Sequence, residues 1–274
     1  MISILILTLN EELNLSACLA SVKWSDDIVV FDSYSTDRSV ELAKAAGARV
    51  VRRKFDNYAA QRNAALAVGY KYPWVLMVDA DEVVPEDLHD EINENLRSVP
   101  EGIEMFRMRR KDMFLGKWLK RSGGYPTWFP RLLRVGRVWA EREINEEMHC
   151  KGAVASLSAH LVHYPFNKGI AFWWERHNRY STMEAAALAH ETRQRMPWKT
   201  LFASDPAARR KGLKQLAYRL PLRPIIVFIY LYIIRMGFLD GVAGWRYCRM
   251  RSIYEYMIDL KLVELRRRDK GLPV

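Results

Sequence analysis

The sequence has few cysteines and no apolar run of the length of a membrane span. Its 274 residues include three cysteines, Cys18, Cys150 and Cys248, far apart and without metal-site spacing. This odd, scattered set argues against a disulfide framework and predicts reduced thiols in a cytosolic setting. The apolar run at 225–234 would cover, as a helix, about half of a bilayer's hydrocarbon core. It predicts either a buried helix or one lying in a membrane interface, with flanking arginines at headgroup level.

Two glycine-rich nucleotide motifs are also absent. No Gly-x-Gly-x-x-Gly follows the first apolar segment, and no Gly-Lys-Ser/Thr occurs anywhere. Dinucleotide-binding and P-loop proteins need such turns because they let phosphates approach backbone N–H groups, so both classes lose their main support. The amino terminus has no basic segment ahead of its apolar residues, which predicts a buried first strand rather than a signal peptide.

Positive charge exceeds negative charge by 11, and basic clusters occur after the first hundred residues, as at 107–111, 209–211 and 266–268. Such clusters favour an anionic membrane surface, phosphate-bearing substrates or nucleic acid, although each one alone is also typical of a solvated face. No recognisable nucleic-acid-binding motif accompanies them, so we expect no nucleic-acid partner.

The first hundred residues alternate short apolar segments with amphipathic helical patterns. Strands are predicted at residues 3–9, 27–31, 48–51 and 74–78, each followed by a helix. Repeated units of this size predict an α/β fold with a mostly parallel sheet and flanking helices.

The pattern changes after residue 100. Strand-like segments at 103–110 and 129–135 enclose an aromatic loop, and 139–149 is polar and acidic. From about Gly169 the chain is helical, with aromatic stripes that predict helix packing. We therefore expect a nucleotide-binding domain over residues 1–167 and a basic helical region over residues 168–274.

Polar side chains gather at the predicted strand ends. Thr8, Asn10 and Glu11 follow the first strand, Asp32 the second, and Asp79 and Asp81 the fourth. Open α/β sheets bind ligands at the carboxyl edge of their strands, so these residues predict a pocket. Two aspartates one residue apart can serve different partners, such as a sugar hydroxyl and a divalent cation that prefers oxygen ligands. The alternative for each residue is an ordinary turn, and Ser35 or Thr36 is an equally good helix N-cap.

The combined motifs resemble the inverting family 2 glycosyltransferases, which have the GT-A nucleotide-sugar-binding fold. The matching stretches are SILILTLNEE, DSYSTD, QRNAAL, VDADE, PRLLRVGRVWAEREINEE and GFLDGVAG, which together extend over nearly the whole chain. More narrowly, the set resembles the bacterial lipopolysaccharide-core β-glucosyltransferase branch.

The resemblance implies a role for each matched residue. Thr8, Asn10 and Glu11 would line the base and ribose of a UDP-sugar, Asp32 would read the uracil edge, Arg62 and Asn63 would border the nucleotide, Asp79 would hold the ribose or sugar, and Asp81 would bind Mg²⁺ or Mn²⁺. His163 lies where related folds supply a further metal or diphosphate contact, although a lone histidine beside aromatics is more often structural.

An inverting reaction also needs a carboxylate that takes the proton of the acceptor hydroxyl. Family members often have a His-Glu pair here, and the matching positions are Asn145 and Glu146. The resemblance implies Glu146 as general base, with Glu147 and Glu143 as competitors because Asn in place of His leaves the register open.

These expectations describe a metal-dependent inverting glycosyltransferase. It would move glucose or a related hexose from a UDP-sugar, with a β-linkage, to a glycan or glycolipid of the cell surface, such as lipopolysaccharide core or exopolysaccharide. It would be cytoplasmic and peripheral, on the anionic inner face of the bacterial cell membrane. The alternative is a non-catalytic, membrane-associated scaffold with a degenerate sugar-nucleotide fold. The sugar, the acceptor and the linkage position are left open.

Overall fold

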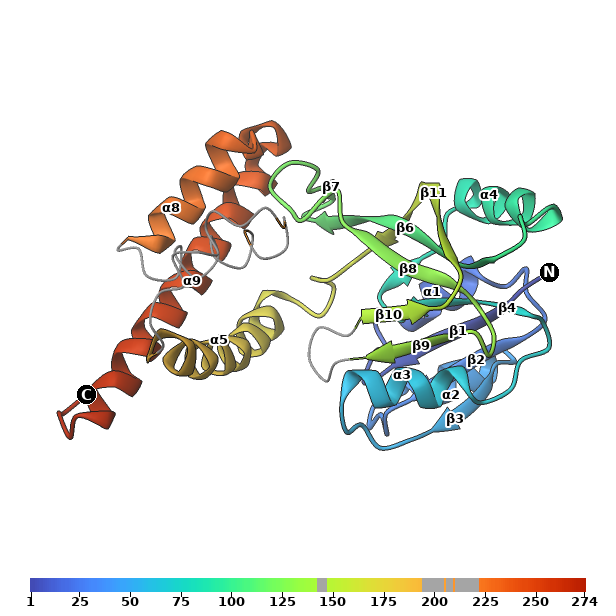
Figure 1. The fold of residues 1–274 in the computed structure, drawn as a ribbon, viewed down its shortest axis with the longest axis horizontal. Helices are drawn as coiled ribbons and strands as arrows, with labels where there is room; N and C mark the ends of the chain where they lie inside the picture. Colours follow the sequence, from blue (N-terminus) through green and yellow to red (C-terminus); the bar gives the residue numbers. More distant parts are fainter. Residues whose placement is uncertain (142–146, 194–204, 206–208, 210–221) are drawn as a thin grey trace. The chain divides into compact units, whose positions relative to one another are not determined.

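A sheet covered by helices forms the first of two units in the computed structural model (Figure 1). The structure describes residues 1–141, 147–193, 205, 209 and 222–274. The first unit comprises residues 1–118 and 124–167, and the second comprises residues 119–123 and 168–274. The short segment 119–123 was not expected to join the helical part of the chain.

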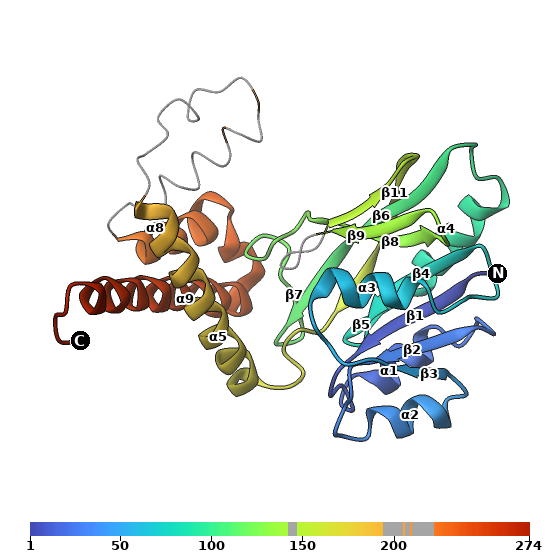
Figure 2. The ribbon, with the colours of Figure 1, turned by 60° about the horizontal axis from the view of Figure 1, so that its bottom comes forward.

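Four parallel strands alternate with helices in the first hundred residues, as predicted. The elements are β1 (Ser3–Thr8), α1 (Leu15–Ser21), β2 (Ile28–Asp32), α2 (Ser39–Ala45), β3 (Arg49–Arg52), α3 (Tyr58–Leu66) and β4 (Trp74–Asp79). Figure 2 shows these strands side by side in the order β3-β2-β1-β4. Thr8 is in register with Asp32, and Leu7 with Asp79, so three of the polar strand ends meet at one edge.

The sheet continues beyond β4 with antiparallel pairing. Its further elements are β5 (Glu82–Val83), α4 (Glu86–Arg97), β6 (Ile103–Phe114), β7 (Lys117–Trp118), β8 (Trp128–Arg134) and β11 (Ala153–His163). The strand order is β4-β8-β6-β11-β5, with β7 paired to β6. Strand β11 runs parallel to β6 and was not predicted, because its alternation of small, polar and apolar residues gives little local signal.

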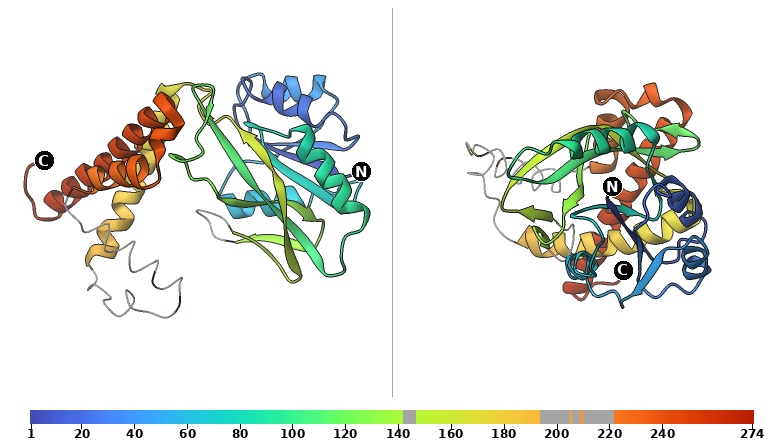
Figure 3. Two further views of the ribbon diagram at one scale, coloured as in Figure 1. Left: turned by 90° about the horizontal axis from the view of Figure 1, so that it is seen from above. Right: turned by 90° about the vertical axis from the view of Figure 1, so that its right-hand side faces the viewer.

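Side chains alternate between two apolar layers along the central strands. Ile4 and Ile6 pack with residues of α1, α2 and α4, whereas Leu5 packs with Ala65 of α3. Figure 3 shows α3 on the opposite side of the sheet from α1, α2 and α4. This double covering explains why the strands are almost continuously apolar rather than alternating.

The polar segment after β8 is a hairpin of β9 (Val138–Glu141) and β10 (Glu147–Cys150). Both amide atoms of Asn63 bond to the backbone of Ala140, at 2.9 Å from Nδ2 to O and 2.7 Å from N to Oδ1. The helix α3 therefore holds this hairpin in place.

The second unit is helical, as predicted. It contains α5 (Ile170–Arg193), α8 (Arg223–Ile229), the π-helical turn η1 (Tyr230–Ile234), the 3₁₀ turn η2 (Gly237–Asp240) and α9 (Gly241–Asp269). The buried Asp240 carboxylate accepts bonds from the N–H groups of Arg121 and Ser122 and from the Ser122 hydroxyl, at 2.7–2.9 Å. These three bonds tie the segment 119–123 into this unit.

One packing prediction for α9 is wrong. Of the stripe Trp245, Cys248, Ser252, Tyr256, Leu260 and Val263, we expected the aromatic residues to pack inside, but Trp245 and Tyr256 are 40% and 54% exposed, whereas Cys248 is buried. The buried residues are Ala243, Gly244, Cys248, Met250, Tyr254, Glu255, Ile258 and Leu262. Apolar residues occur on more than one side of this helix, so its buried side is decided by α5 and α8, which pack against it.

Candidate active site

Asp79, the last residue of β4, lies where the sheet changes from parallel to antiparallel pairing. Its N–H donates to Oε2 of Glu82 at 2.9 Å, and the N–H of Ala80 donates to the Leu7 carbonyl. Glu82 is fully buried. The acidic turn 79–82 is therefore folded back on itself, with one carboxylate inside the protein and another at the strand end.

Arg131 joins the two carboxylates of this turn. Its Nη2 lies 2.5 Å from Oδ2 of Asp79 and 2.8 Å from Oε1 of Glu82. Arg62 lies 3.8 Å from Asp79, and Arg110 lies 3.4 Å from Glu82. Burial alone would raise the pKa of Asp79, but the charges of Arg131 and Arg62 outweigh burial and hold this pKa well below its ordinary value.

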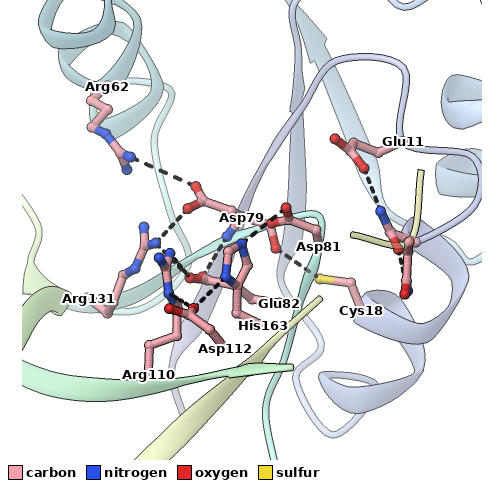
Figure 4. A network of polar contacts seen from close by, with 12 residues as sticks. Glu11, Cys18, Arg62, Asp79, Asp81, Glu82, Arg110, Asp112, Arg131 and His163 are labelled. Carbon is pink, nitrogen blue, oxygen red and sulfur yellow. Dashed lines mark hydrogen bonds and ion pairs between the residues drawn. The ribbon is translucent and has the colours of Figure 1, made fainter. Parts of the chain in front are cut away.

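His163 joins two further carboxylates. Its Nε2 is 3.2 Å from Oδ2 of Asp81, and its Nδ1 is 2.7 Å from Oδ1 of Asp112 (Figure 4). Burial would lower the pKa of His163, but the bonds to Asp112 and Asp81 raise it to about 9. His163 is therefore protonated at neutral pH. Burial would raise the pKa values of Asp81 and Asp112, but the hydrogen bonds and charge of His163, with Arg110, outweigh burial and lower both.

A cavity of about 560 Å³ opens beside Asp79. Its lining includes the guanidinium groups of Arg62, Arg110 and Arg131, the rings of Trp128 and Phe129, and residues 147–149 of β10. Cationic groups fixed around one wall are suited to the oxygens of a diphosphate. The aromatic rings provide an apolar surface beside them.

Asp81 has the donor chemistry of a divalent cation site, and His163 can join it as the neutral imidazole once a bound cation has displaced its proton. Asp81 supplies a hard oxygen ligand, and Asp112 orients the His163 ring in the way that second-shell carboxylates orient metal-binding histidines. Within the described ranges, no three His, Cys, Asp or Glu residues are grouped closely enough to hold a metal by themselves. The pair therefore fits a cation that takes its remaining ligands from a bound diphosphate and from water.

The predicted nucleotide-binding residues at the ends of β1 and β2 are brought together. Asp32 is fully buried, accepts the N–H of Ser35 at 3.1 Å, and pairs with Arg52 at 3.2 Å. Asn10 adopts a positive φ of 53° and its Oδ1 accepts the N–H of Thr36 at 2.8 Å. The Thr8 hydroxyl is buried and has no hydrogen-bond partner among the described residues.

The loops after β1 and β2 are joined by hydrogen bonds, and the expected N-cap role of Ser35 or Thr36 is not observed. Neither Ser35 nor Thr36 caps the next helix, because α2 begins at Ser39 and the Ser35 hydroxyl instead accepts the N–H of Asn10. Glu11 accepts the side-chain amide of Asn14 at 2.8 Å, and its own N–H donates to the Ser39 hydroxyl. The loops after β1 and β2 therefore support each other.

Of the remaining predicted residues, Arg62 contacts a carboxylate of the site, whereas Asn63 holds the β9–β10 hairpin. Arg62 reaches Asp79, whereas both ends of the Asn63 amide are taken up by the hairpin. The proposed base Glu146, with Asn145 and its competitor Glu143, lies outside the described residues. Its other competitor, Glu147, begins β10 and lines the cavity.

Sequence reasoning missed Glu82 and Asp112 as members of the site. Glu82 follows the Asp-x-Asp motif directly, but only its burial beside Arg131 marks it. Asp112 pairs in register with His163 through β6 and the unpredicted strand β11. No local pattern indicates this contact.

Residues 3–155, more than half of the chain, match the family model "Glycosyl transferase family 2". The chain therefore belongs to this family and is a glycosyltransferase. The observed sheet, mostly parallel at its amino-terminal end with helices on both faces, is its GT-A fold.

Known proteins resemble the chain over most of its length. An uncharacterized glycosyltransferase of Rickettsia bellii is 26% identical, covering 96% of this chain and 86% of that protein. The lipopolysaccharide core biosynthesis glycosyltransferase LpsC of Rhizobium meliloti is 25% identical, covering 96% and 92%.

A solved structure overlaps a smaller part of the chain. It is glucosyl-3-phosphoglycerate synthase from Mycobacterium tuberculosis in complex with Mn²⁺, UDP and glucosyl-3-phosphoglycerate. The match has a TM-score of 0.36 and 26% identity, and it covers 40% of this chain and 44% of that one. An overlap this limited assigns no ligand to the present chain.

Proposed function

We propose that this enzyme is a metal-dependent, inverting hexosyltransferase. It takes glucose or a related hexose from a UDP-sugar and attaches it by a β-linkage to a cell-surface glycan or glycolipid, of which lipopolysaccharide core is the best candidate. The acceptor class is supported by similarity to LpsC over nearly the whole chain. The donor class is supported by family membership and by Asp79, a strand-end carboxylate on the cavity wall.

The observation that carries this proposal is the balanced charge of the site. Arg62, Arg110, Arg131 and protonated His163 offset four carboxylates, Asp79, Asp81, Glu82 and Asp112. A divalent cation and a diphosphate enter together with opposite charge, so the site accepts both without a large electrostatic cost. A bound Mg²⁺ or Mn²⁺ would be held by Asp81, and by His163 after this residue loses its proton, and it would neutralise charge on the departing UDP.

The protein groups have separate tasks in this mechanism. Arg131 keeps Asp79 ionised and fixed at the strand end, where its carboxylate can accept hydroxyl groups of the ribose or sugar. Arg62 and Arg110 face the cavity and bind diphosphate oxygens. Glu146 removes the proton of the attacking acceptor hydroxyl, and Glu147, on the cavity wall, is the alternative base.

A donor screen tests the proposal. Purified protein is incubated with Mn²⁺, extracted glycolipid and individual UDP-sugars, UDP release is measured, and the product is identified by mass analysis. We expect one UDP-hexose to be turned over and the product anomer to be inverted. Binding of UDP without release from any UDP-sugar would instead support the non-catalytic scaffold.

The catalytic base is tested by a matched pair of variants. Glu146→Gln is expected to abolish transfer without changing UDP affinity, whereas Glu147→Gln retains most activity. The reverse result would assign the base to Glu147. Equal and full activity of both variants would reject this base assignment.

We also propose that the helical unit holds the enzyme on the cytoplasmic face of the membrane. Large apolar residues are exposed along α8, η1, η2 and the start of α9: Ile225, Ile226, Ile229, Tyr230, Ile233, Ile234, Met236, Phe238, Leu239, Val242 and Trp245. Arg235 and Arg249 lie in the same segments, and this composition suits a membrane interface with anionic lipids.

A membrane-spanning mode was compared with this peripheral mode by the length and composition of the helices. Within the described residues no single helix is long and apolar enough to cross a membrane, whereas the segments Arg223–Ile234 and Gly237–Asp269, bent by 72°, together pass the same test. Flotation with vesicles distinguishes these modes: peripheral protein is released by alkaline carbonate and spanning protein is not. Ile229→Asp with Ile233→Asp should abolish vesicle binding if this surface is the anchor.

A further inference from the structure

Outside the balanced site, one face of the sheet carries alternating cations and aromatic rings. We call Arg107, Arg109, Lys111, Trp118, Tyr125 and Trp128 the cation–aromatic row; they come from β6, β7, β8 and the loop before β8. Residues 107, 109 and 111 are two apart along β6, so their side chains share one face. Arg107 is exposed and the other five are half-buried.

Each cation of the row lies over a ring. The guanidinium carbons of Arg107 and Arg109 lie 5.1 and 4.9 Å from the Trp128 ring centre, and Nζ of Lys111 lies 5.3 Å from that of Trp118. The Arg109 guanidinium also donates to the Tyr125 hydroxyl at 3.1 Å. Tyr125 in turn packs edge-on against Trp118 at 4.9 Å.

Strand β11, which pairs with β6 on the edge opposite β8, also bonds to the two arginines. Arg107 donates to the Ser156 hydroxyl at 2.9 Å, and Arg109 donates to the Ser158 carbonyl at 2.6 Å. Because both ends of these contacts are on strands, the guanidinium groups are fixed before any ligand arrives. Preorganised donors bind a partner with a smaller loss of side-chain entropy.

The charge of the row is not balanced. In the part of the chain that the structure describes, Arg107, Arg109 and Lys111 form no ion pair with a carboxylate. Arg110, the residue between Arg109 and Lys111 on β6, pairs instead with Asp112 at 2.9 Å and with Glu82 at 3.4 Å. Three neighbouring cations repel each other, and this repulsion is relieved when anionic groups lie between them.

The row begins at the active-site cavity. Trp128 lines the cavity that contains Asp79, and it also contacts Arg107 and Arg109. Lys111 lies farther along β6, toward its carboxyl end, and Trp118 lies on β7, which pairs with that end of β6. Trp128 is the residue that the row shares with the cavity, so an extended ligand with several negative charges could contact the row and reach the cavity past Trp128.

We propose that the cation–aromatic row binds the acceptor, and that the acceptor is an acidic oligosaccharide. Its phosphate or carboxylate groups contact Arg107, Arg109 and Lys111, and its sugar rings pack against the exposed parts of the aromatic side chains. This inference rests on the proposed glycosyltransfer at the adjacent cavity. It adds that acidic groups on the acceptor, and not only the attacking hydroxyl, are recognised.

The test measures binding rather than turnover, so that it does not depend on the identity of the donor. The probes for calorimetric titration are a deacylated lipopolysaccharide core oligosaccharide, which carries phosphate and carboxylate groups, a neutral dextran oligosaccharide of equal length, and a single-stranded oligonucleotide. We expect the wild type to bind the acidic oligosaccharide at least tenfold more tightly than dextran or the oligonucleotide.

The decisive variant is Arg107→Gln with Lys111→Gln, and its matched control is Lys23→Gln with Lys44→Gln, two exposed lysines elsewhere. The row variant should weaken acidic oligosaccharide binding at least tenfold, with its Tm and its Kd for UDP unchanged. The control should change oligosaccharide binding less than twofold.

Equal effects of the two double variants would overturn the proposal, as would equal affinity for dextran and the acidic oligosaccharide. Preferred binding of the oligonucleotide would assign the row to nucleic acid instead. Failure of the proposed transferase activity gives a different signature, because UDP turnover would then be absent in the wild type whatever the row binds.

Discussion

Each unit of this protein contains a buried arginine paired with carboxylates, and the two groups have different surroundings. In the first unit, Arg131 contacts Asp79 and Glu82 at the ends of strands and beside a cavity. In the second, Arg223 contacts Glu255 of α9 and lies 3.6 Å from Asp259. Both arginines are at most 5% exposed.

Burial and neighbouring charge have opposite effects on a carboxylate pKa, and a different one of the two prevails in each group. Burial raises the pKa of Asp259 and the nearby arginines do not overcome it. At Asp79, Arg131 and Arg62 outweigh burial and the pKa falls. A buried ion pair alone therefore does not mark an active site; several cations directed at a carboxylate on a cavity wall do.

The largest expected effect is on kcat, which should fall when a carboxylate of the first group's site is changed and not when one of the second group is changed. Asp81→Asn should lower kcat about 10³-fold at saturating Mn²⁺, because it removes the proposed metal ligand. Glu255→Gln, in the helical unit, should leave kcat within about twofold. Steady-state UDP release measures both, and full activity of Asp81→Asn would exclude its metal role.

Replacing the arginine of each group tests how much each group contributes to the free energy of unfolding. Arg131→Met and Arg223→Met should each lower the free energy of unfolding by about 3 kcal/mol or more, because each leaves carboxylates buried without their main partner. Denaturant unfolding measures this loss. UDP affinity, measured on the folded fraction, should fall only in Arg131→Met; an equal fall in both would remove the distinction between them.

Asp112→Asn probes the indirect contact to the metal site. The ring of His163 would lose its charged partner, and second-shell changes of this kind typically weaken metal affinity or activity about 10- to 100-fold. The apparent Kd for Mn²⁺ should rise while UDP binding without metal stays constant. An unchanged Kd for Mn²⁺ would show that His163 does not take part in metal binding.

The smallest predicted effect compares two histidines by pH. In EDTA, His163, with its pKa raised to about 9, contributes stability that is fully present below pH 6.5 and lost as pH rises through 9. His177 of α5, whose pKa burial lowers to about 4, contributes stability present above pH 6.5 and lost as pH falls through 4.

Substitution should remove each slope separately. His163→Gln should flatten the alkaline fall in unfolding free energy by about 3 kcal/mol, and His177→Gln should flatten only the acid fall. Denaturant unfolding from pH 4 to pH 9.5 measures both slopes. The same slope in the His163 variant and the wild type would contradict the proposed charge on His163.

The helices and parallel strands of the first hundred residues could be predicted because their signals are local. An apolar run such as 74–78, followed by Asp79 and Asp81, indicates a buried strand with acidic residues at its end. The same reasoning missed β11, although this strand carries His163 to Asp112. It also placed the segment 119–123 with its neighbours in sequence, whereas Asp240 holds it in the helical unit.

The sequence by itself determined the class of fold and the edge of the sheet at which the polar strand ends meet, because side-chain periodicity and strand ends are encoded within about ten residues. Tertiary structure alone decided that Glu82 is buried against Arg131, that His163 lies between two aspartates, and that three cations of β6 form a row with rings from β7, β8 and a loop. Glu82 and Arg131 are 49 positions apart in the sequence, and Asp81 and His163 are 82 positions apart. The strength of these contacts depends on burial and on neighbouring charge, which the order of residues along the chain does not reveal.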